Sequence, residues 1–266
     1  MRVLLLSIAL IISTNSNAQI TPKYIHKNST EISKNLFMSA CEVSNMQYKV
    51  FNEFVKSAGN QEQIDIVSID TLNWINNNFY NSPYVNHYYS HNAYKQYPVV
   101  NVSYNAALLY CRWLTDNYNN SSKKKYKQVV FRLPTKDEWV IAVKSENPEN
   151  IYPWSGNSVF NENGTCRANF KREQQKTEIK SGELHDNADV LAPVFAYWPN
   201  KSGLYNLSGN AAEMLADQSG TAGGSYMNTK DYLSVNAKDP FEGLFSNPDS
   251  SHQAVGFRWV MEVIEE

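Results

Sequence analysis

The feature that most constrains the fold of this chain is the loss of regular patterning after Ser145. From that point Gly, Pro, Asn and Asp recur, and the aliphatic runs are short. These residues interrupt helices and strands, so only short strands are expected there, at Ala192–Tyr197, Thr221–Tyr226 and Val255–Val260. A domain with so much irregular backbone needs something besides secondary structure to hold its loops.

The first half, in contrast, carries three helix starts. Ser44 with Gln47 forms a capping box, Ser103 is a cap after Pro98, and Thr135 with Glu138 repeats the capping box. A short strand is expected before the first helix. The residues predicted to face the core from these helices are Tyr48, Phe51, Phe54 and Val55, then Ala107, Tyr110, Trp113 and Leu114, then Trp139, Ala142 and Val143. Helices followed by short strands predict an α+β fold in a single domain, residues 35–266.

Two segments of the first half have no clear period. Residues 19–34 are polar, and we expect them to be extended or mobile. Residues 59–97 are rich in Asn, Tyr and His and are interpreted as a long irregular region. Within them His87 and His91 have i, i+4 spacing and could hold a metal if helical, but the Tyr- and Asn-rich context favours a loop.

The N-terminal 18 residues read as a secretory signal peptide. Arg2 precedes the apolar run Val3–Ile12, and Ser16-Asn17-Ala18 provides small residues for cleavage before Gln19. The alternative is a buried N-terminal strand. No Cys follows the small residues, and no other apolar run approaches the roughly 18 residues of a membrane helix. We therefore expect an exported protein, periplasmic or secreted, with no transmembrane segment in the mature chain.

Charge and cysteine content narrow the function further. The formal net charge is −2, from 24 basic and 26 acidic residues, which gives no electrostatic case for nucleic acid. The basic run Lys123–Lys127 is interpreted as a solvated loop rather than a binding patch. The three cysteines, Cys41, Cys111 and Cys166, allow one disulfide at most, and Cys111 is expected to pack as a small buried hydrophobe.

Six sequence blocks, taken in order, resemble the formylglycine-generating enzyme (sulfatase-modifying factor) family. They are E-V-S-N-M-Q-Y at Glu42–Tyr48, P-V-V-N-V-S-Y at the start of Pro98–Leu114, R-L-P-T-K-D-E-W at Arg132–Trp139, Y-P-W-S-G-N at Tyr152–Asn157, G-L-Y-N-L-S-G-N-A-A-E-M at Gly203–Met214 and G-G-S-Y-M-N-T-K-D-Y-L at Gly223–Leu233. The resemblance covers nearly the whole chain from Phe37 to Val260. It implies the family's variant of the C-type-lectin-like fold, with little regular secondary structure.

The resemblance also implies two calcium ions that hold the loops. One site would use the side chains of Asn169 and Asp186 with the carbonyls of Phe170 and Ala188. The other would use the side chains of Asn206 and Glu213 with the carbonyls of Gly209 and Ala211. Carboxylate, amide and carbonyl oxygens are the ligands that calcium prefers. The alternative is that Asn206 and Asn210 are turn residues and that Glu213 is a surface charge.

The same resemblance argues against the family's copper-dependent oxidation of a substrate cysteine. Its two catalytic cysteine positions hold Asn228 and Leu233 here, and no Cys lies beyond Cys166. Cu(I) is a soft ion that selects thiolates, so copper is not expected. The arginine-rich stretch that follows in the family is replaced by S-V-N-A-K-D-P after Leu233.

Two functions remain open. The first is an exported, non-catalytic member that binds an envelope or secreted protein or a glycan; family-like lipoproteins of gliding motility and type IX secretion are the nearest conceptual relatives, although the lipid-attachment Cys is absent. The second is an oxidoreductase of altered chemistry in the same cleft. The cleft candidates are Ser225, Tyr226, Asn228, Asp249, Ser250 and Arg258. The added helical domain of the family's iron enzymes does not fit in this chain.

Overall fold

The structure, a computed structural model, describes residues 20–75, 82–145, 147–172, 190–218 and 220–266. The predicted signal peptide, together with Asp186 and Ala188 of the first predicted calcium site, lies outside these residues. None of the helices in the described ranges has both the length and the apolar character required to cross a membrane.

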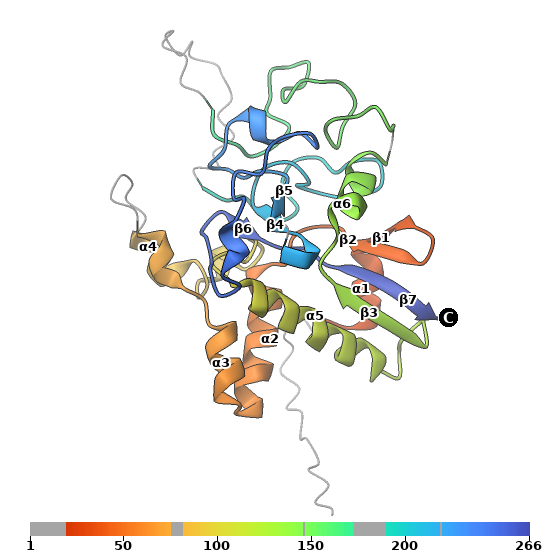
Figure 1. Cartoon of the computed structure of the whole chain (residues 1–266), viewed down its shortest axis with the longest axis vertical. Helices are drawn as coiled ribbons and strands as arrows, with labels where there is room; N and C mark the ends of the chain where they lie inside the picture. Colours follow the sequence, from red (N-terminus) through yellow and green to blue (C-terminus); the bar gives the residue numbers. More distant parts are fainter. Residues whose placement is uncertain (1–19, 76–81, 146, 173–189, 219) are drawn as a thin grey trace, which may run out of the picture.

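A four-stranded antiparallel sheet forms the larger of two sheets, with the strand order β1-β2-β7-β3 (Figure 1). Its strands are β1 (Ser29–Ser33), β2 (Leu36–Ser39), β3 (Gln128–Arg132) and β7 (Val260–Glu265). The last strand of the chain, β7, lies inside the sheet, where Val260 pairs with Met38 on one side and with Arg132 on the other. The smaller sheet has the order β5-β4-β6, from β4 (Ala212–Met214), β5 (Thr221–Ala222) and β6 (Val255–Gly256).

The three predicted helices are confirmed. They are α2 (Asn45–Ala58), α5 (Tyr104–Asn119) and α6 (Lys136–Val143), with side-chain caps from Ser44, Ser103 and Thr135. Both predicted capping boxes are present, since Gln47 and Glu138 each accept a bond from the backbone of their cap residue. The prediction that Phe54 faces the core is wrong. Its side chain is 52% exposed, because it lies on the solvent side of α2, away from the buried stripe of Tyr48, Phe51 and Val55.

Aromatic packing around Tyr110 joins the helices to the C-terminal segment. The Tyr110 ring lies 6.3 Å from Tyr48, 5.3 Å from Phe51 and 5.3 Å from Phe257, measured between ring centroids. All four rings are almost completely buried. Because Phe257 is fixed in this core, the neighbouring Arg258 is also held inside the molecule. All three cysteines are free and buried, and burial raises the pKa of Cys111 to about 12.

Two expectations for the N-terminal half are corrected. Residues 22–27 form helix α1 (Pro22–Lys27) and 29–33 form β1, where an extended or mobile segment was expected; Ile20 and Ile25 bury against the core, and Thr21 caps α1. Residues 59–97 contain α3 (Gln61–Val67), η1 (Thr71–Trp74), α4 (Ser82–His87) and η2 (Asn92–Tyr94). These helices are short and held by caps and tertiary packing, so their period was too brief to recognise.

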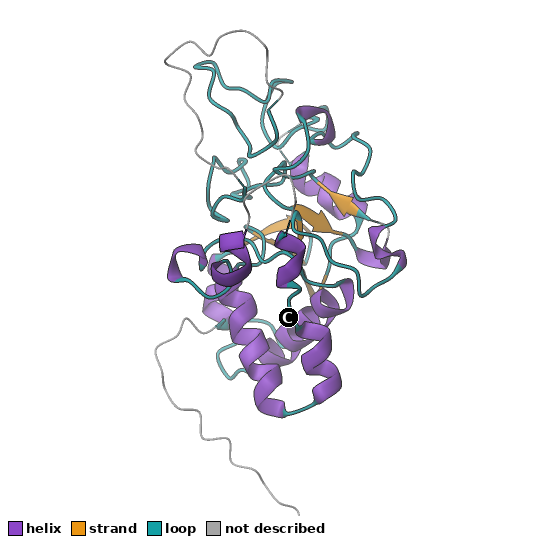
Figure 2. Cartoon of the chain, turned by 90° about the vertical axis from the view of Figure 1, so that its left-hand side faces the viewer, coloured by secondary structure: helices purple, strands orange, loops and turns teal. Residues whose placement is uncertain are grey.

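The second half has little regular structure, as expected. Figure 2 shows the helices gathered towards one end of the molecule and long loops at the other. Residues 192–197 form no strand, and the other two predicted strands shrink to β5 and β6, with β7 beginning only at Val260. The loops also contain the single turns η3 (Ala216–Gln218), η4 (Lys230–Tyr232) and η5 (Leu244–Ser246).

Candidate functional site

The G-G pair that follows β5 is required by close backbone contacts. Gly223 and Gly224 have φ of 90° and 64°, in the left-handed region. A Cβ at Gly223 would lie 2.8 Å from the Leu207 carbonyl oxygen, and a Cβ at Gly224 would lie 2.7 Å from that of Tyr232. A larger residue would clash at either position, so the pair is scaffold.

Asn228, at the first cysteine position of the family, closes a tight turn. Its Oδ1 accepts hydrogen bonds from Ser225 Oγ at 2.6 Å and from Ser225 N at 2.9 Å. Its backbone N–H donates to the Ser225 carbonyl at 3.0 Å, and its carbonyl accepts from Lys171 N at 2.9 Å. The structure therefore brings together two predicted cleft residues, Ser225 and Asn228, but it does so through bonds that shape the backbone.

Leu233, at the second cysteine position, is completely buried. It packs in a hydrophobic cluster with Tyr152, Val159, Cys166, Ala168 and Phe170. Its carbonyl accepts a hydrogen bond from Ser208 Oγ at 2.8 Å. A leucine side chain has no atom that could bind a metal, and its burial among apolar side chains stabilises the fold.

The remaining cleft candidates are spread over different surroundings. Tyr226 donates its backbone N–H to the Asn210 carbonyl at 2.9 Å and packs against an aromatic cluster that contains Trp74 and Tyr88. Asp249 is exposed and accepts a bond from Asn105 Nδ2 at 2.8 Å, which ties its loop, including Ser250, to the start of α5. Burial raises the pKa of Tyr226 and keeps its hydroxyl protonated.

Arg258 lies in the core rather than on the wall of an open cleft, in contrast to the prediction, because it is 0% exposed. It donates to Glu213 through Nε at 2.6 Å and through Nη2 at 2.5 Å. Glu213 also accepts from Trp139 Nε1 at 3.3 Å. Burial lowers the pKa of the Arg258 guanidinium, but the attraction of Glu213 outweighs it and holds the pKa above its ordinary value. Glu213 is 1% exposed, so it is not a surface charge.

Beside this ion pair lies a second buried carboxylate that the sequence analysis did not single out, Glu42. Its Oε2 accepts from Asn206 Nδ2 at 3.1 Å, and its Oε1 accepts from Asn210 Nδ2 at 2.8 Å. Burial raises the pKa of Glu42 to about 7, although Arg258 acts in the opposite direction. A charged residue just before a capped helix was the available signal, but its partners lie more than 160 positions away along the chain.

Asn210 connects the two predicted calcium loops. Its backbone N–H donates to the Asn169 carbonyl at 2.8 Å, and its Oδ1 accepts from Asn169 Nδ2 at 3.2 Å. Gly209 packs so closely here that a Cβ would lie 2.3 Å from the Asn169 carbonyl oxygen. The described half of the first site, Asn169 with Phe170, therefore lies directly against the second site.

The donor atoms of the second predicted calcium site are of the kinds that calcium binds. Asn206, Gly209, Ala211 and Glu213 belong to one continuous loop that enters β4, and the Gly209 carbonyl accepts no hydrogen bond from the described residues. Glu42 and Glu213 against Arg258 leave one net negative charge when all three ionise, which a cation would balance. Since Oε1 of Glu213 accepts from Arg258 alone, it retains a lone pair for a further partner.

The chain matches the family described as sulfatase-modifying factor enzyme 1-like domain over residues 14–263. It is 28% identical over 172 residues to the inactive C-alpha-formylglycine-generating enzyme 2 of Bos taurus, covering 61% of this chain and 50% of that protein. It is 30% identical over 187 residues to the formylglycine-generating enzyme of Thermomonospora curvata, covering 61% and 54%. The chain thus spans about half the length of the curated relatives it matches.

Two solved structures resemble this fold over most of both chains. CarF gives a TM-score of 0.56 at 19% identity and covers 86% of each chain. Treponema denticola variable protein 1 gives a TM-score of 0.53 at 18% identity, covering 85% of this chain and 84% of that one. At these identities the similarity concerns the fold alone, and it confirms the predicted α+β architecture with few regular elements.

Proposed function

This chain belongs to the sulfatase-modifying factor family, among relatives named as formylglycine-generating enzymes, and from this premise we propose its function. We propose that it is a non-catalytic member that is exported, is stabilised by calcium and binds a protein or a glycan of the cell envelope. Export rests on the apolar run behind Arg2, and calcium on the donor set around Asn206 and Glu213.

The observation that carries the proposal is the state of the two cysteine positions. The side-chain oxygen of Asn228 accepts two hydrogen bonds from Ser225, and Leu233 is completely buried among apolar side chains. Neither residue supplies the thiolate that Cu(I) requires. Two of the relatives, from Bos taurus and Mus musculus, are themselves named as inactive.

Exposed aromatic side chains support a binding role for the loop-rich half. Five large aromatic side chains are exposed among the described residues. One of them, Phe54, lies on α2 in the first half. The other four lie in the loop-rich second half: Phe160, Phe195, Trp198 and Tyr232. Aromatic residues are enriched at the centre of protein interfaces, because they bury a large area and lose little conformational entropy.

The first experiment measures the metal content of protein purified without chelators, by elemental mass spectrometry, together with oxygen consumption in the presence of a cysteine-containing peptide. We expect about two calcium ions per chain by resemblance to the family, no stoichiometric copper or iron, and no thiol-dependent oxygen uptake. A stoichiometric transition metal with thiol-dependent oxygen uptake would replace the binding proposal with an oxidoreductase of altered chemistry.

The second experiment measures co-sedimentation with an isolated envelope fraction for the wild type, Trp198→Ala and Phe54→Ala. Trp198 is 61% exposed and Phe54 52%, so each substitution removes an aromatic side chain that is more than half exposed, one in the loop-rich half and one on α2. We expect Trp198→Ala to weaken binding about tenfold, as for an interface anchor, and Phe54→Ala to leave it unchanged. Equal losses, or no binding by the wild type, would argue against a loop-borne binding surface.

A further inference from the structure

The N-terminal arm, residues 20–28, is attached to α5 by apolar packing and by two polar contacts. Ile20 and Ile25 are buried in the main hydrophobic core. Asn117 Nδ2 of α5 donates to the Ile20 carbonyl at 2.9 Å, and His26 Nε2 lies 2.8 Å from the Tyr118 hydroxyl oxygen. One of the two polar contacts therefore depends on an imidazole, the side chain that ordinarily changes charge between pH 5 and pH 8.

The Tyr118 hydroxyl joins the arm to the α5–β3 loop, residues 120–127. Tyr118 is completely buried, and its oxygen accepts from Lys125 N and from Tyr126 N, at 3.2 Å each. A hydroxyl has two lone pairs and one hydrogen. The two backbone N–H groups use both lone pairs, so the hydrogen is donated to His26 Nε2. The neutral ring of His26 then carries its own proton on Nδ1.

A protonated His26 does not fit this arrangement. The imidazolium ring donates from both nitrogens and accepts at neither. Its Nε2–H would point at a Tyr118 oxygen whose two lone pairs are already used by Lys125 N and Tyr126 N. The hydroxyl hydrogen would lose its acceptor at the same time. Because a buried polar group without a partner is costly, protonation should break the contact between α1 and α5.

The surroundings of the ring also favour its neutral form. The pKa of His26 is lowered, first by burial and second by the positive charge of Lys125. The ring packs edge-on against Tyr118 and Tyr126, with centroids 5.6 Å and 5.5 Å apart. Lys125 is held nearby, since its Nζ donates to the Tyr126 hydroxyl at 3.0 Å.

The charged and titratable groups around His26 come from four elements. They are Lys23 and Lys27 on α1 itself, Tyr118 on α5, Lys125 and Tyr126 on the α5–β3 loop, and Glu31 on β1. The charge of Glu31 acts on Lys125. From β2 the uncharged Phe37 packs on Tyr126, at 5.9 Å between centroids. Three lysines and one carboxylate leave an excess of positive charge, which disfavours an imidazolium.

We propose that the contact between His26 and Tyr118 is an acid-sensitive attachment, which holds the N-terminal arm and the α5–β3 loop together while His26 is neutral and releases them when the ring is protonated. Since the folded pKa is lowered, the stabilisation is complete above about pH 6.5, the ordinary value, and is lost as pH falls below it. Release would uncover the apolar side chains of Ile20 and Ile25. This inference does not depend on the proposed function, because it involves no residue of the cleft, of the predicted calcium sites or of the exposed aromatic set.

The test measures backbone amide exchange of the mature protein by NMR between about pH 7.5 and about pH 5, as protection factors, and titrates the His26 ring. We expect a His26 midpoint below about 6.5. The protection of the Lys125 and Tyr126 amides should fall by up to about tenfold per pH unit below pH 6.5, the limit for release coupled to one proton.

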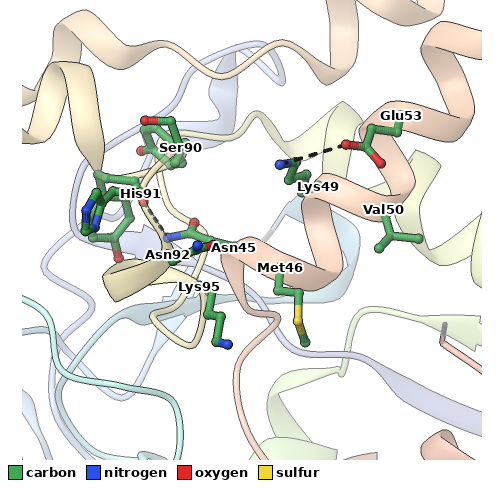
Figure 3. Close-up of a pocket in the computed structure, with 11 residues that line it drawn as sticks. Asn45, Met46, Lys49, Val50, Glu53, Ser90, His91, Asn92 and Lys95 are labelled. Carbon is green, nitrogen blue, oxygen red and sulfur yellow. Dashed lines mark hydrogen bonds and ion pairs between the residues drawn. The ribbon is translucent and has the colours of Figure 1, made fainter. Parts of the chain in front are cut away.

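Two variants separate this contact from other effects of pH. His26→Gln keeps an acceptor for the Tyr118 hydroxyl that does not titrate, so the protection of the two amides should no longer depend on pH. The matched control is His91→Gln, which should retain the pH dependence of the wild type. His91 lines a pocket between α2 and residues 88–95 that shares no residue with the His26 cluster (Figure 3).

Three results would overturn the proposal: a His26 midpoint at or above about 6.5, wild-type protection that does not change with pH, or the same pH dependence in His26→Gln as in the wild type. The first two need no variant, so they decide the question even if His26→Gln folds poorly. Glu42, whose pKa is raised, acts with the opposite sign and is unchanged in His26→Gln. Failure of this test leaves the envelope-binding result with Trp198→Ala untouched, so the two proposals fail separately.

Discussion

Replacing Arg258 with methionine removes the cation of the buried ion pair and keeps most of the side-chain volume. The guanidinium contacts Glu213 twice and also donates to the carbonyls of Ser39, at 3.2 Å through Nη1, and of Tyr205, at 2.7 Å through Nη2. These three partners come from β2, the Gly203–Met214 loop and β4. The variant therefore removes the Arg258 donor from two core carbonyls and from the Glu213 carboxylate, which keeps only the bond from Trp139 Nε1.

The expected loss follows from that count. Breaking a buried ion pair on one side costs about 3–5 kcal/mol, because the remaining charge stays buried without a partner. Since the free energy of unfolding of typical proteins is about 5–15 kcal/mol, Arg258→Met should remove a large share of it. The double variant Glu213→Gln/Arg258→Met removes both charges and should recover part of the loss.

The assay is urea unfolding at pH 7 followed by tryptophan fluorescence. Arg132→Met is the matched control, since Arg132 contacts Glu138 at 2.7 Å but has a side chain that is 32% exposed. We expect the control to lose only about 1 kcal/mol. If Arg258→Met lost no more than Arg132→Met, or if the double variant were less stable than Arg258→Met, the buried pair could not be what holds these loops.

Three further predictions use the same unfolding measurements. In the presence of a calcium chelator, the free energy of unfolding should fall by up to ~3 kcal/mol as pH rises from about 4.5 to about 7, because over this range Glu42 is protonated in the folded protein and ionised in the unfolded chain. Glu42→Gln should flatten this pH profile, and an unchanged profile in the variant would contradict the prediction. Calcium at 100 times its dissociation constant should add about 2.7 kcal/mol that chelation removes and that magnesium does not restore, and equal effects of both ions would exclude a calcium-selective site. Leu233→Ala should cost about 2–5 kcal/mol and Leu72→Ala, at a position that is 65% exposed, less than about 0.5, whereas similar losses would show that Leu233 is not a core residue.

Local signals predict the three longest helices, α2, α5 and α6. The capping boxes at Ser44 and Thr135 and the cap at Ser103 are made by residues within three positions of each other, so their geometry follows from the chain itself. The shortest strands are predicted less well: β4 has no counterpart among the expected strands, and β5 and β6 are shorter than expected, because these strands are two or three residues long and depend on pairing with each other. Residues 59–97 differ from the expected irregular region because their helices are short and depend on caps and tertiary packing.

The candidate site divides along the same line. Sequence by itself determined the family, the capped helices, the loop-rich second half and the replacement of both copper-ligand positions, because each depends on residue identity at a given place. Only the tertiary structure decided that Arg258 is a core cation, that Leu233 is a packing residue and that Glu42 meets Asn206 and Asn210. Those contacts join positions far apart in the chain, and whether a charge is paired and buried depends on the surroundings that folding assembles around it.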